Sequence, residues 1–279
     1  MKSALMSLLA WLLLAAVAVY LLVGALLYLQ QERLLFPAPR GEVAGLARQP
    51  GIEPLEIATG EDGVTLHGAL RRADNAGPVR LIVYFGGNGE LASAALPDPR
   101  WPPGWTVAAI EYRGYGRSGG RPSEQALFAD ALRVHDELVR RLGVAPHRFV
   151  AVGRSLGSGV AVWLASQREI AGVALVTPYD SITEVAAGIY PWLPVRYLIR
   201  HAFDSHRIAH DIRTPALFVT AGRDTLIRAH HSERLLQAWA GPKRHVDLAA
   251  ADHDDVLDHD EWWHELRRFV AQLAGAARR

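Results

Sequence analysis

The chain has two different hydrophobic patterns, one at its N-terminus and one that begins near residue 53. From Ser3 to Leu29 there is no charged residue, and this stretch exceeds the about 20 residues that cross a bilayer as a helix. After residue 53, short and solid apolar runs alternate with longer amphipathic stretches. We therefore expect an N-terminal transmembrane helix followed by a domain of alternating strands and helices.

The first pattern predicts an uncleaved membrane anchor over residues 1–30. A cleaved signal peptide, with a shorter apolar core of about 7 to 15 residues and a small-residue cleavage site, is the alternative. Residues 31–52 are rich in Pro and Gly without a sustained period, which predicts a juxtamembrane linker before a domain over residues 53–279. Lys2 before the anchor and arginines after it leave the membrane side of the domain open.

The order of the apolar runs predicts the architecture of the domain. An alternating stretch around Glu61-Asp62-Gly63 predicts a β-hairpin. Buried strands are predicted for the solid runs at 81–85, 107–110, 149–152, 173–176 and 216–220, with a weaker one at 245–248. Helices are predicted from 123 to 143, after 155, over about 228–241 and from 260 onward. This alternation gives an α/β fold with a mostly parallel sheet flanked by helices.

Composition narrows the classes of function. The chain has 279 residues, a formal net charge of +1 and no dense basic block, so nothing indicates nucleic-acid binding. With no cysteine, it has no disulfide, thiol nucleophile or cysteine-ligated metal. The Asp and His cluster at 251–265 lacks paired ligands on one helix face, and the glycines at 153–159 lack the lysine of a phosphate-binding loop. We expect no metal and no cofactor.

A serine between two glycines follows the strand at 149–152. In the stretch GRSLG it lies on a predicted strand-to-helix turn, which is sharp enough to require small residues such as Gly153 and Gly157. The helix that begins there directs free N–H groups toward an oxyanion formed at the serine. Ser155 is therefore the candidate nucleophile, and the N–H of Leu156 is a candidate oxyanion donor.

A serine hydroxyl needs a base, and the base needs a carboxylate that orients it. Asp224 follows the strand at 216–220 and His253 follows the last short strand, so both are predicted in loops at the same sheet edge as Ser155. The other histidines after Asp224 fall on predicted helices or at the far end of a strand: His230, His231, His245, His259 and His264. We predict a triad of Ser155, His253 and Asp224.

These motifs together resemble the α/β-hydrolase superfamily. The resemblance extends from residue 53 to the end of the chain and rests on YFGGNGE (84–90), EYRGYGRSGGRPSE (111–124), GRSLGSG (153–159), AGRDTLI (221–227) and ADHDDV (251–256). With the anchor followed by QERLLFP, the chain is similar to membrane-anchored serine hydrolases of the ABHD type and to serine aminopeptidase-like hydrolases. The resemblance implies the α/β-hydrolase fold with a short lid after the strand at 173–176.

The glycine loop departs from the family pattern at one position. Related sequences usually read His-Gly-Asn where this chain has Gly86, Gly87 and Asn88. The alignment makes the N–H of Asn88 the second oxyanion donor. Gly87 and Tyr112, at the same sheet edge, are expected near the substrate. A structural role for the EYRGYG motif, with Arg113 paired to an acid, is the alternative.

The apolar lid and the membrane anchor favour lipid or acylated substrates. Tyr190, Trp192 and apolar neighbours can cover an acyl group or touch the bilayer, although core packing is the alternative. We expect a membrane-anchored serine hydrolase of carboxylic esters or thioesters, acting on lipid or acylated substrates. The alternatives are an aminopeptidase-type peptidase or amidase, with Glu111 near the substrate amine, and a catalytically silent membrane-tethered interaction module.

Overall fold

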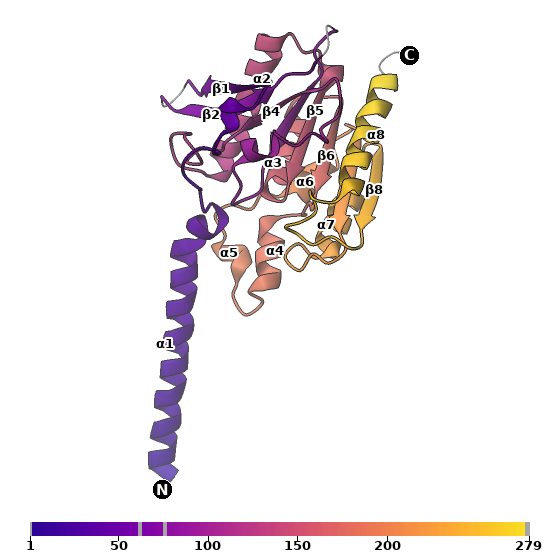
Figure 1. Cartoon of the computed structure of the whole chain (residues 1–279). Helices are drawn as coiled ribbons and strands as arrows, with labels where there is room; N and C mark the ends of the chain where they lie inside the picture. Colours follow the sequence, from indigo (N-terminus) through magenta and orange to yellow (C-terminus); the bar gives the residue numbers. More distant parts are fainter. Residues whose placement is uncertain (1, 61–62, 75–76, 277–279) are drawn as a thin grey trace.

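The computed structural model describes residues 2–60, 63–74 and 77–276. Within these residues, eight strands form one sheet, from which a long N-terminal helix projects (Figure 1). The strands are β1 Ile52–Ala58, β2 Thr65–Arg71, β3 Leu81–Phe85, β4 Thr106–Ile110, β5 Phe149–Arg154, β6 Gly172–Val176, β7 Ala216–Ala221 and β8 Lys243–Leu248. The α-helices are α1 Lys2–Leu35, α2 Glu124–Leu142, α3 Leu156–Gln167, α4 Ile182–Ile189, α5 Val195–Leu198, α6 Ser205–Ala209, α7 Ala229–Ala238 and α8 Asp260–Ala276.

The sheet is mostly parallel, as the sequence predicts. Its strand order is β1-β2-β4-β3-β5-β6-β7-β8, and β2 pairs antiparallel with both β1 and β4. All pairings from β4–β3 to β7–β8 are parallel, so the carboxyl ends of these strands share one edge. The predicted hairpin and the predicted solid runs are confirmed as strands. The turn predicted at Glu61 and Asp62 lies outside the described residues.

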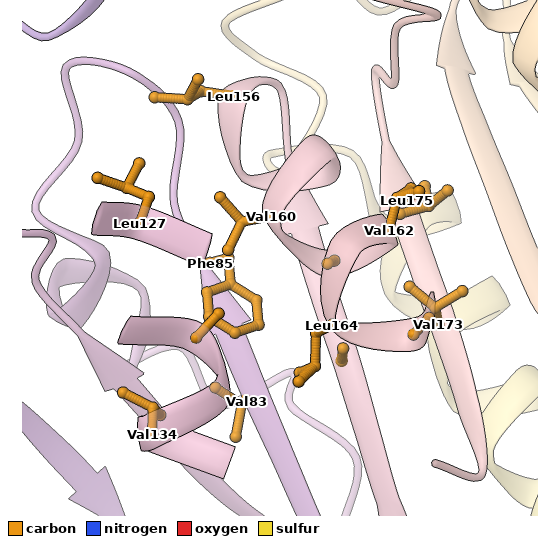
Figure 2. Close-up of a cluster of buried hydrophobic side chains, with 14 of the residues drawn as sticks. Val83, Phe85, Leu127, Val134, Leu156, Val160, Val162, Leu164, Val173 and Leu175 are labelled. Atoms are coloured by element: carbon orange, nitrogen blue, oxygen red, sulfur yellow. The ribbon is translucent and has the colours of Figure 1, made fainter. Parts of the chain in front are cut away.

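Helices cover both faces of the sheet because its central strands are apolar on both sides. Every residue of β3, β4, β6 and β7 is buried. On one face, Val83 and Phe85 of β3 pack with Leu127 of α2 and Val160 of α3 (Figure 2). On the other face, alternate side chains of the same strands pack with Trp262 of α8. The domain therefore has three layers, with the sheet in the middle.

Helix α2 begins and ends at the residues that the sequence indicates. The hydroxyl of Ser123 accepts a hydrogen bond from the N–H of Ala126 at 3.2 Å and caps the first turn. Gly143 ends the helix with a φ of 63°, a left-handed conformation that glycine adopts without strain. These caps fix the length of the helix that covers β3 and β5.

Helix α1 is longer than the predicted anchor. Residues 31–35, predicted as linker, continue the helix to Leu35, and Phe36 after it is buried in the domain core. The prediction ended the helix too early because the proline and glycine residues that indicate a linker begin only at Pro37. Among the described residues, α1 is a helix long and apolar enough to cross a membrane.

Candidate active site

Ser155 occupies a strained turn between β5 and α3. Its backbone has a φ of 49° and a ψ of −118°, and a positive φ is rare for a residue with a side chain. A Cβ on Gly153 would lie 2.3 Å from the carbonyl oxygen of Gly157, and a Cβ on Gly157 would lie 2.1 Å from that of Phe85. Both distances are shorter than any carbon–oxygen contact, so the turn requires glycine at both positions.

The structure brings the three predicted catalytic side chains into line. His253 Nε2 lies 2.9 Å from Ser155 Oγ, and His253 Nδ1 lies 2.7 Å from Asp224 Oδ2. They meet because Ser155 follows β5, Asp224 follows β7 and His253 follows β8, all at the carboxyl edge of the sheet. With the carboxylate ionised, Nδ1 of His253 carries the proton, and Nε2 is free to accept one from the serine hydroxyl.

The carboxylate of Asp224 is fixed by its own loop. Its Oδ1 accepts hydrogen bonds from the N–H groups of Leu226 at 2.9 Å and Ile227 at 2.7 Å. This leaves Oδ2 for His253. Only 3% of the Asp224 side chain and 13% of the His253 side chain are exposed, so little water competes for this contact. The histidine ring is therefore held in one orientation toward the serine.

The two candidate oxyanion donors, Asn88 and Leu156, line the same cavity as Ser155. Leu156 is the first residue of α3, so its N–H has no acceptor within the helix. Asn88 follows β3 and lines the same cavity as Ser155 and Leu156. Gly87, which was predicted near the substrate, donates its N–H to Glu90 Oε2 at 2.8 Å, and a Cβ built on it would lie 3.8 Å from the Cβ of Ser155. Gly87 therefore supports the loop, and the N–H of Asn88 remains the candidate donor.

Two charged residues that the sequence analysis did not single out connect the loops of the site. The Glu90 carboxylate accepts hydrogen bonds from Gly87 N–H and from the Tyr84 hydroxyl at 2.8 and 2.7 Å, and it pairs with Arg154 Nη1 at 3.1 Å. Arg154 also donates to the carbonyl oxygen of His253 at 3.0 Å. The pair thus joins the glycine loop to the histidine loop. Its signal in the sequence was an arginine at the end of an otherwise apolar strand.

Two buried tyrosines donate hydrogen bonds to carbonyl oxygens of the glycine loop. The hydroxyl of Tyr112 donates to the carbonyl oxygen of Gly86 at 2.8 Å, and that of Tyr115 to the carbonyl oxygen of Asn88 at 2.7 Å. Burial raises the pKa of Tyr112 well above its ordinary value, so its hydroxyl stays a donor. Tyr112, expected near the substrate, is buried and is not among the described residues that line the Ser155 cavity. Arg113 pairs with an acid of α2, which matches the structural alternative.

An apolar cavity of about 350 Å³ opens onto Ser155. The lid segment with α4 and α5 forms one wall and includes Tyr190. The C-terminal turns of α1 form another wall. Trp192, predicted as a pocket residue, is not among the described residues that line this cavity; it lines a neighbouring groove with α1, where its ring meets that of Tyr20 with centroids 6.0 Å apart. The cavity volume is typical of sites for small molecules.

The groups at this site suit nucleophilic attack on a carbonyl carbon. A hydroxyl that lines the cavity has a base for its proton beside it, and the two candidate oxyanion donors belong to residues that line the same cavity. Within the described part of the chain, no group of three or more His, Asp or Glu side chains is placed to hold a metal ion.

Comparison with known proteins tests the resemblance found in the sequence. A sequence model described as alpha/beta hydrolase fold matches residues 84–209. An uncharacterized protein of Mycobacterium tuberculosis is 35% identical over 250 residues, which cover 88% of this chain and 89% of that protein. The alpha/beta hydrolase domain-containing protein 17B of Xenopus laevis is 31% identical over 166 residues, or 60% of this chain and 56% of that protein. The chain belongs to the α/β-hydrolase superfamily.

Solved structures show the same α/β-hydrolase fold at lower identity. The Pyrococcus furiosus esterase Pf2001 has a TM-score of 0.67 and 19% identity, over 85% of this chain and 97% of the esterase. Est1E from Butyrivibrio proteoclasticus, solved with bound ferulic acid, has a TM-score of 0.63 and 17% identity, over 79% of this chain and 99% of its own. At such identities the comparison supports the fold, and the substrate has to be argued from the cavity of this α/β-hydrolase.

Proposed function

We propose that the protein is a serine hydrolase that cleaves carboxylic esters or thioesters of long acyl chains. The observation that carries this proposal is the apolar cavity, about 350 Å³ in volume, that is lined by Ser155, whose Oγ lies beside the Nε2 of His253. A reactive polar centre at the end of an apolar cavity suits a substrate whose carbonyl group terminates a hydrocarbon chain.

The acyl-enzyme route gives each group of the site one role. Ser155 Oγ attacks the carbonyl carbon while His253 Nε2 takes the hydroxyl proton. The N–H groups of Asn88 and Leu156 stabilise the negative charge on the carbonyl oxygen. When the bond to the leaving oxygen or sulfur breaks, His253 gives it the proton. Water then attacks the acyl-enzyme with the same imidazole as base, the bond to Ser155 Oγ breaks to release the carboxylic acid, and His253 returns the proton to the serine. Asp224 stabilises the imidazolium in both halves.

The surroundings of Glu111 favour an ester over a peptide substrate. An aminopeptidase needs an acidic side chain near the serine to bind the free amine of its substrate. Glu111 is only 5% exposed, and its carboxylate accepts hydrogen bonds from the N–H groups of Ala92 and Ser93 at 2.8 and 3.2 Å. It lines a different cavity, and among the described residues around the Ser155 cavity there is no acidic side chain.

The N-terminal helix supports lipid or acylated substrates. Helix α1 has 34 residues and is exposed along its first six turns, as a lipid-facing helix would be. We infer that it anchors the protein in a bilayer and that residues 53–279 form the hydrolase domain beside it. The cavity then lies next to the membrane, where long-chain esters and thioesters are concentrated.

The proposal is tested with the detergent-solubilised full-length protein. A fluorophosphonate probe is expected to label the wild type but neither Ser155→Ala nor a heat-denatured sample. The wild type is then expected to hydrolyse palmitoyl esters or thioesters faster than acetyl ones. Failure of the folded wild type to react with the probe would favour the silent module. Activity confined to short, soluble esters would contradict the lipid assignment.

A further inference from the structure

The membrane helix forms part of the cavity that ends at Ser155. Six residues of α1 line the cavity opposite the lid: Gly24, Leu27, Tyr28, Gln31, Leu34 and Leu35. Figure 1 shows α4 and α5 beside the end of α1 that enters the domain. The same helix that crosses the bilayer therefore continues as a wall of the site.

Helix α1 meets the lid along one face. Residues 2–22 are all exposed, and the half-buried positions begin at Val23 and Gly24 and recur at Leu27, Gln31 and Leu35. This spacing of about four residues places them on one side of the helix. A Cβ added to Gly24 would lie 3.4 Å from a methyl carbon of Leu193 in the lid, so the helix and the lid are in close contact there.

A glutamine amide fixes the helix to the lid backbone. Gln31 Nε2 donates to the carbonyl oxygen of Leu198 at 3.2 Å, and Gln31 Oε1 accepts from the N–H of Arg200 at 2.8 Å. The Arg200 guanidinium lies over the ring of Tyr28, 4.4 Å from its centroid. Near a membrane, polar groups without partners are costly, so these paired contacts define the separation of helix and lid.

The length of the uncharged stretch places the cavity at the membrane surface. Crossing the hydrocarbon core takes about 20 helical residues, and the stretch from Ser3 to Gln31 exceeds this by more than two turns. The extra turns are those that line the cavity. Just before them, the Tyr20 hydroxyl donates to the carbonyl oxygen of Trp192 at 3.1 Å. Tyr and Trp concentrate at the interface between membrane and water, which is where this contact would lie.

We propose that the acyl chain of a substrate in the bilayer enters between α1 and the lid and lies against Leu27. Helix α1 then selects the acyl chain in addition to anchoring the protein. This inference rests on the serine hydrolase function proposed above. The chemical class of the occupant is a single saturated or unsaturated hydrocarbon chain that ends in an ester or thioester carbonyl at Ser155.

The test uses a matched pair of substitutions on neighbouring leucines of the full-length protein in detergent. Leu27→Trp fills the cavity, whereas Leu26→Trp adds the same bulk at a position that is 50% exposed and faces away from it. We expect Leu27→Trp to lower the ratio of kcat/KM for palmitoyl over acetyl esters about 10-fold or more, and Leu26→Trp to leave it unchanged. Leu27→Ala, which enlarges the cavity, is expected to shift the preferred chain to a longer one.

The outcomes separate this inference from the proposed function. If Leu27→Trp and Leu26→Trp give the same chain-length profile, and Leu27→Ala gives that of the wild type, α1 does not contact the acyl chain. If the wild type hydrolyses no acyl substrate, or Ser155→Ala retains activity, the hydrolase proposal itself fails. Labelling of each variant by the fluorophosphonate probe shows that the serine site is folded before the profiles are compared.

A second pair tests the contact between helix and lid. Gln31→Ala removes both hydrogen bonds to the lid backbone, and Gln30→Ala changes the same residue type on the exposed side. We expect Gln31→Ala to flatten the chain-length profile because the wall of the cavity is no longer fixed, and Gln30→Ala to preserve it. Equal profiles for the two variants would overturn the role of Gln31.

Discussion

Replacing Glu90 by alanine is expected to lower kcat by about 10- to 100-fold with little change in KM. The carboxylate accepts from the N–H of Gly87 at 2.8 Å and from the hydroxyl of Tyr84 at 2.7 Å, and it pairs with Arg154 at 3.1 Å. The variant removes all three contacts next to Asn88, whose N–H is the proposed oxyanion donor. The loop that carries this donor is then free to move.

The magnitude follows from what the variant removes and what it leaves. Complete loss of one oxyanion donor costs about 100- to 1000-fold in kcat. In Glu90→Ala the donor remains, but its loop loses a charge-assisted hydrogen bond worth about 1.5 to 3 kcal/mol. The carbonyl oxygens of Gly86 and Asn88 keep their tyrosine donors. The loss is therefore partial, and it falls on kcat because the oxyanion exists only during the reaction.

The assay is steady-state hydrolysis of an acetyl ester, with the rate of fluorophosphonate labelling and the melting temperature measured alongside. Glu53→Ala is the matched control, because Glu53 pairs with Arg72 at 2.8 Å on the surface and is half exposed. Such exposed pairs contribute little, so its kcat is expected to equal that of the wild type. A folded Glu90→Ala variant with wild-type kcat would refute the reasoning, since the loop would then be held without Glu90.

Three further substitutions test the site and its scaffold. Gly157→Ala is expected to lower the free energy of unfolding by about 1 to 3 kcal/mol, because its Cβ would lie 2.1 Å from the carbonyl oxygen of Phe85 in β3. An unchanged urea midpoint would contradict this. Asp224→Asn is expected to reduce kcat by about 10⁴-fold. Two backbone N–H groups hold the oxygen at the Oδ1 position, so the amide NH₂ faces His253 and forces the ring proton onto Nε2. A near-normal kcat would exclude the role assigned to Asp224. Burial acts to raise the pKa of Asp180, but the hydrogen bond from His231 and its other partners hold it below its ordinary value. Asp180→Ala is therefore expected to lose about 3 kcal/mol of stability at pH 7. Its difference from the wild type in urea should narrow as the pH falls below about 4, because the unfolded chain takes up the Asp180 proton before the folded protein does; a gap independent of pH would contradict this.

The sequence predicts those parts of the fold and site that depend on local pattern. Solid apolar runs mark the parallel strands because both faces of each strand are buried. Gly153 and Gly157 mark the serine turn because a Cβ at either position would overlap a backbone oxygen. Asp224 and His253 follow from these strands, since a loop after a parallel strand lies at the edge that also holds Ser155.

The sequence does not predict which side chains of distant segments contact each other. Glu90 and Arg154 are 64 positions apart, and neither belongs to a periodic pattern that would point to the other. The contact between Gln31 and the lid joins segments 167 positions apart for the same reason. Trp192 was predicted in the pocket from its apolar character and its position in the lid, which do not show whether its ring lines the Ser155 cavity or the neighbouring groove beside Tyr20.

The sequence resemblance implies a histidine where this chain has Gly86, and the same carboxylate limits the space at this position. A Cβ on Gly86 would lie 3.2 Å from Glu90 Cδ and 3.3 Å from Ala92 Cβ. A methyl group needs only a shift of a few tenths of an ångström. We expect a larger imidazole ring to displace Glu90 from the N–H of Gly87. Gly86 and Glu90 therefore act as a matched pair that supports the loop in this chain.

Restoring the family residue is consequently expected to damage the site. Gly86→His should lower kcat by about 10-fold or more, to a level similar to Glu90→Ala, whereas Gly86→Ala should keep most of the wild-type rate. Combining Gly86→His with Glu90→Ala should cost little beyond either change alone, because both act by removing the same contact. Full activity of Gly86→His would mean that the ring fits beside Glu90, and the loop would then have a support other than the one seen here. Additive losses in the double variant would show that the two residues act independently.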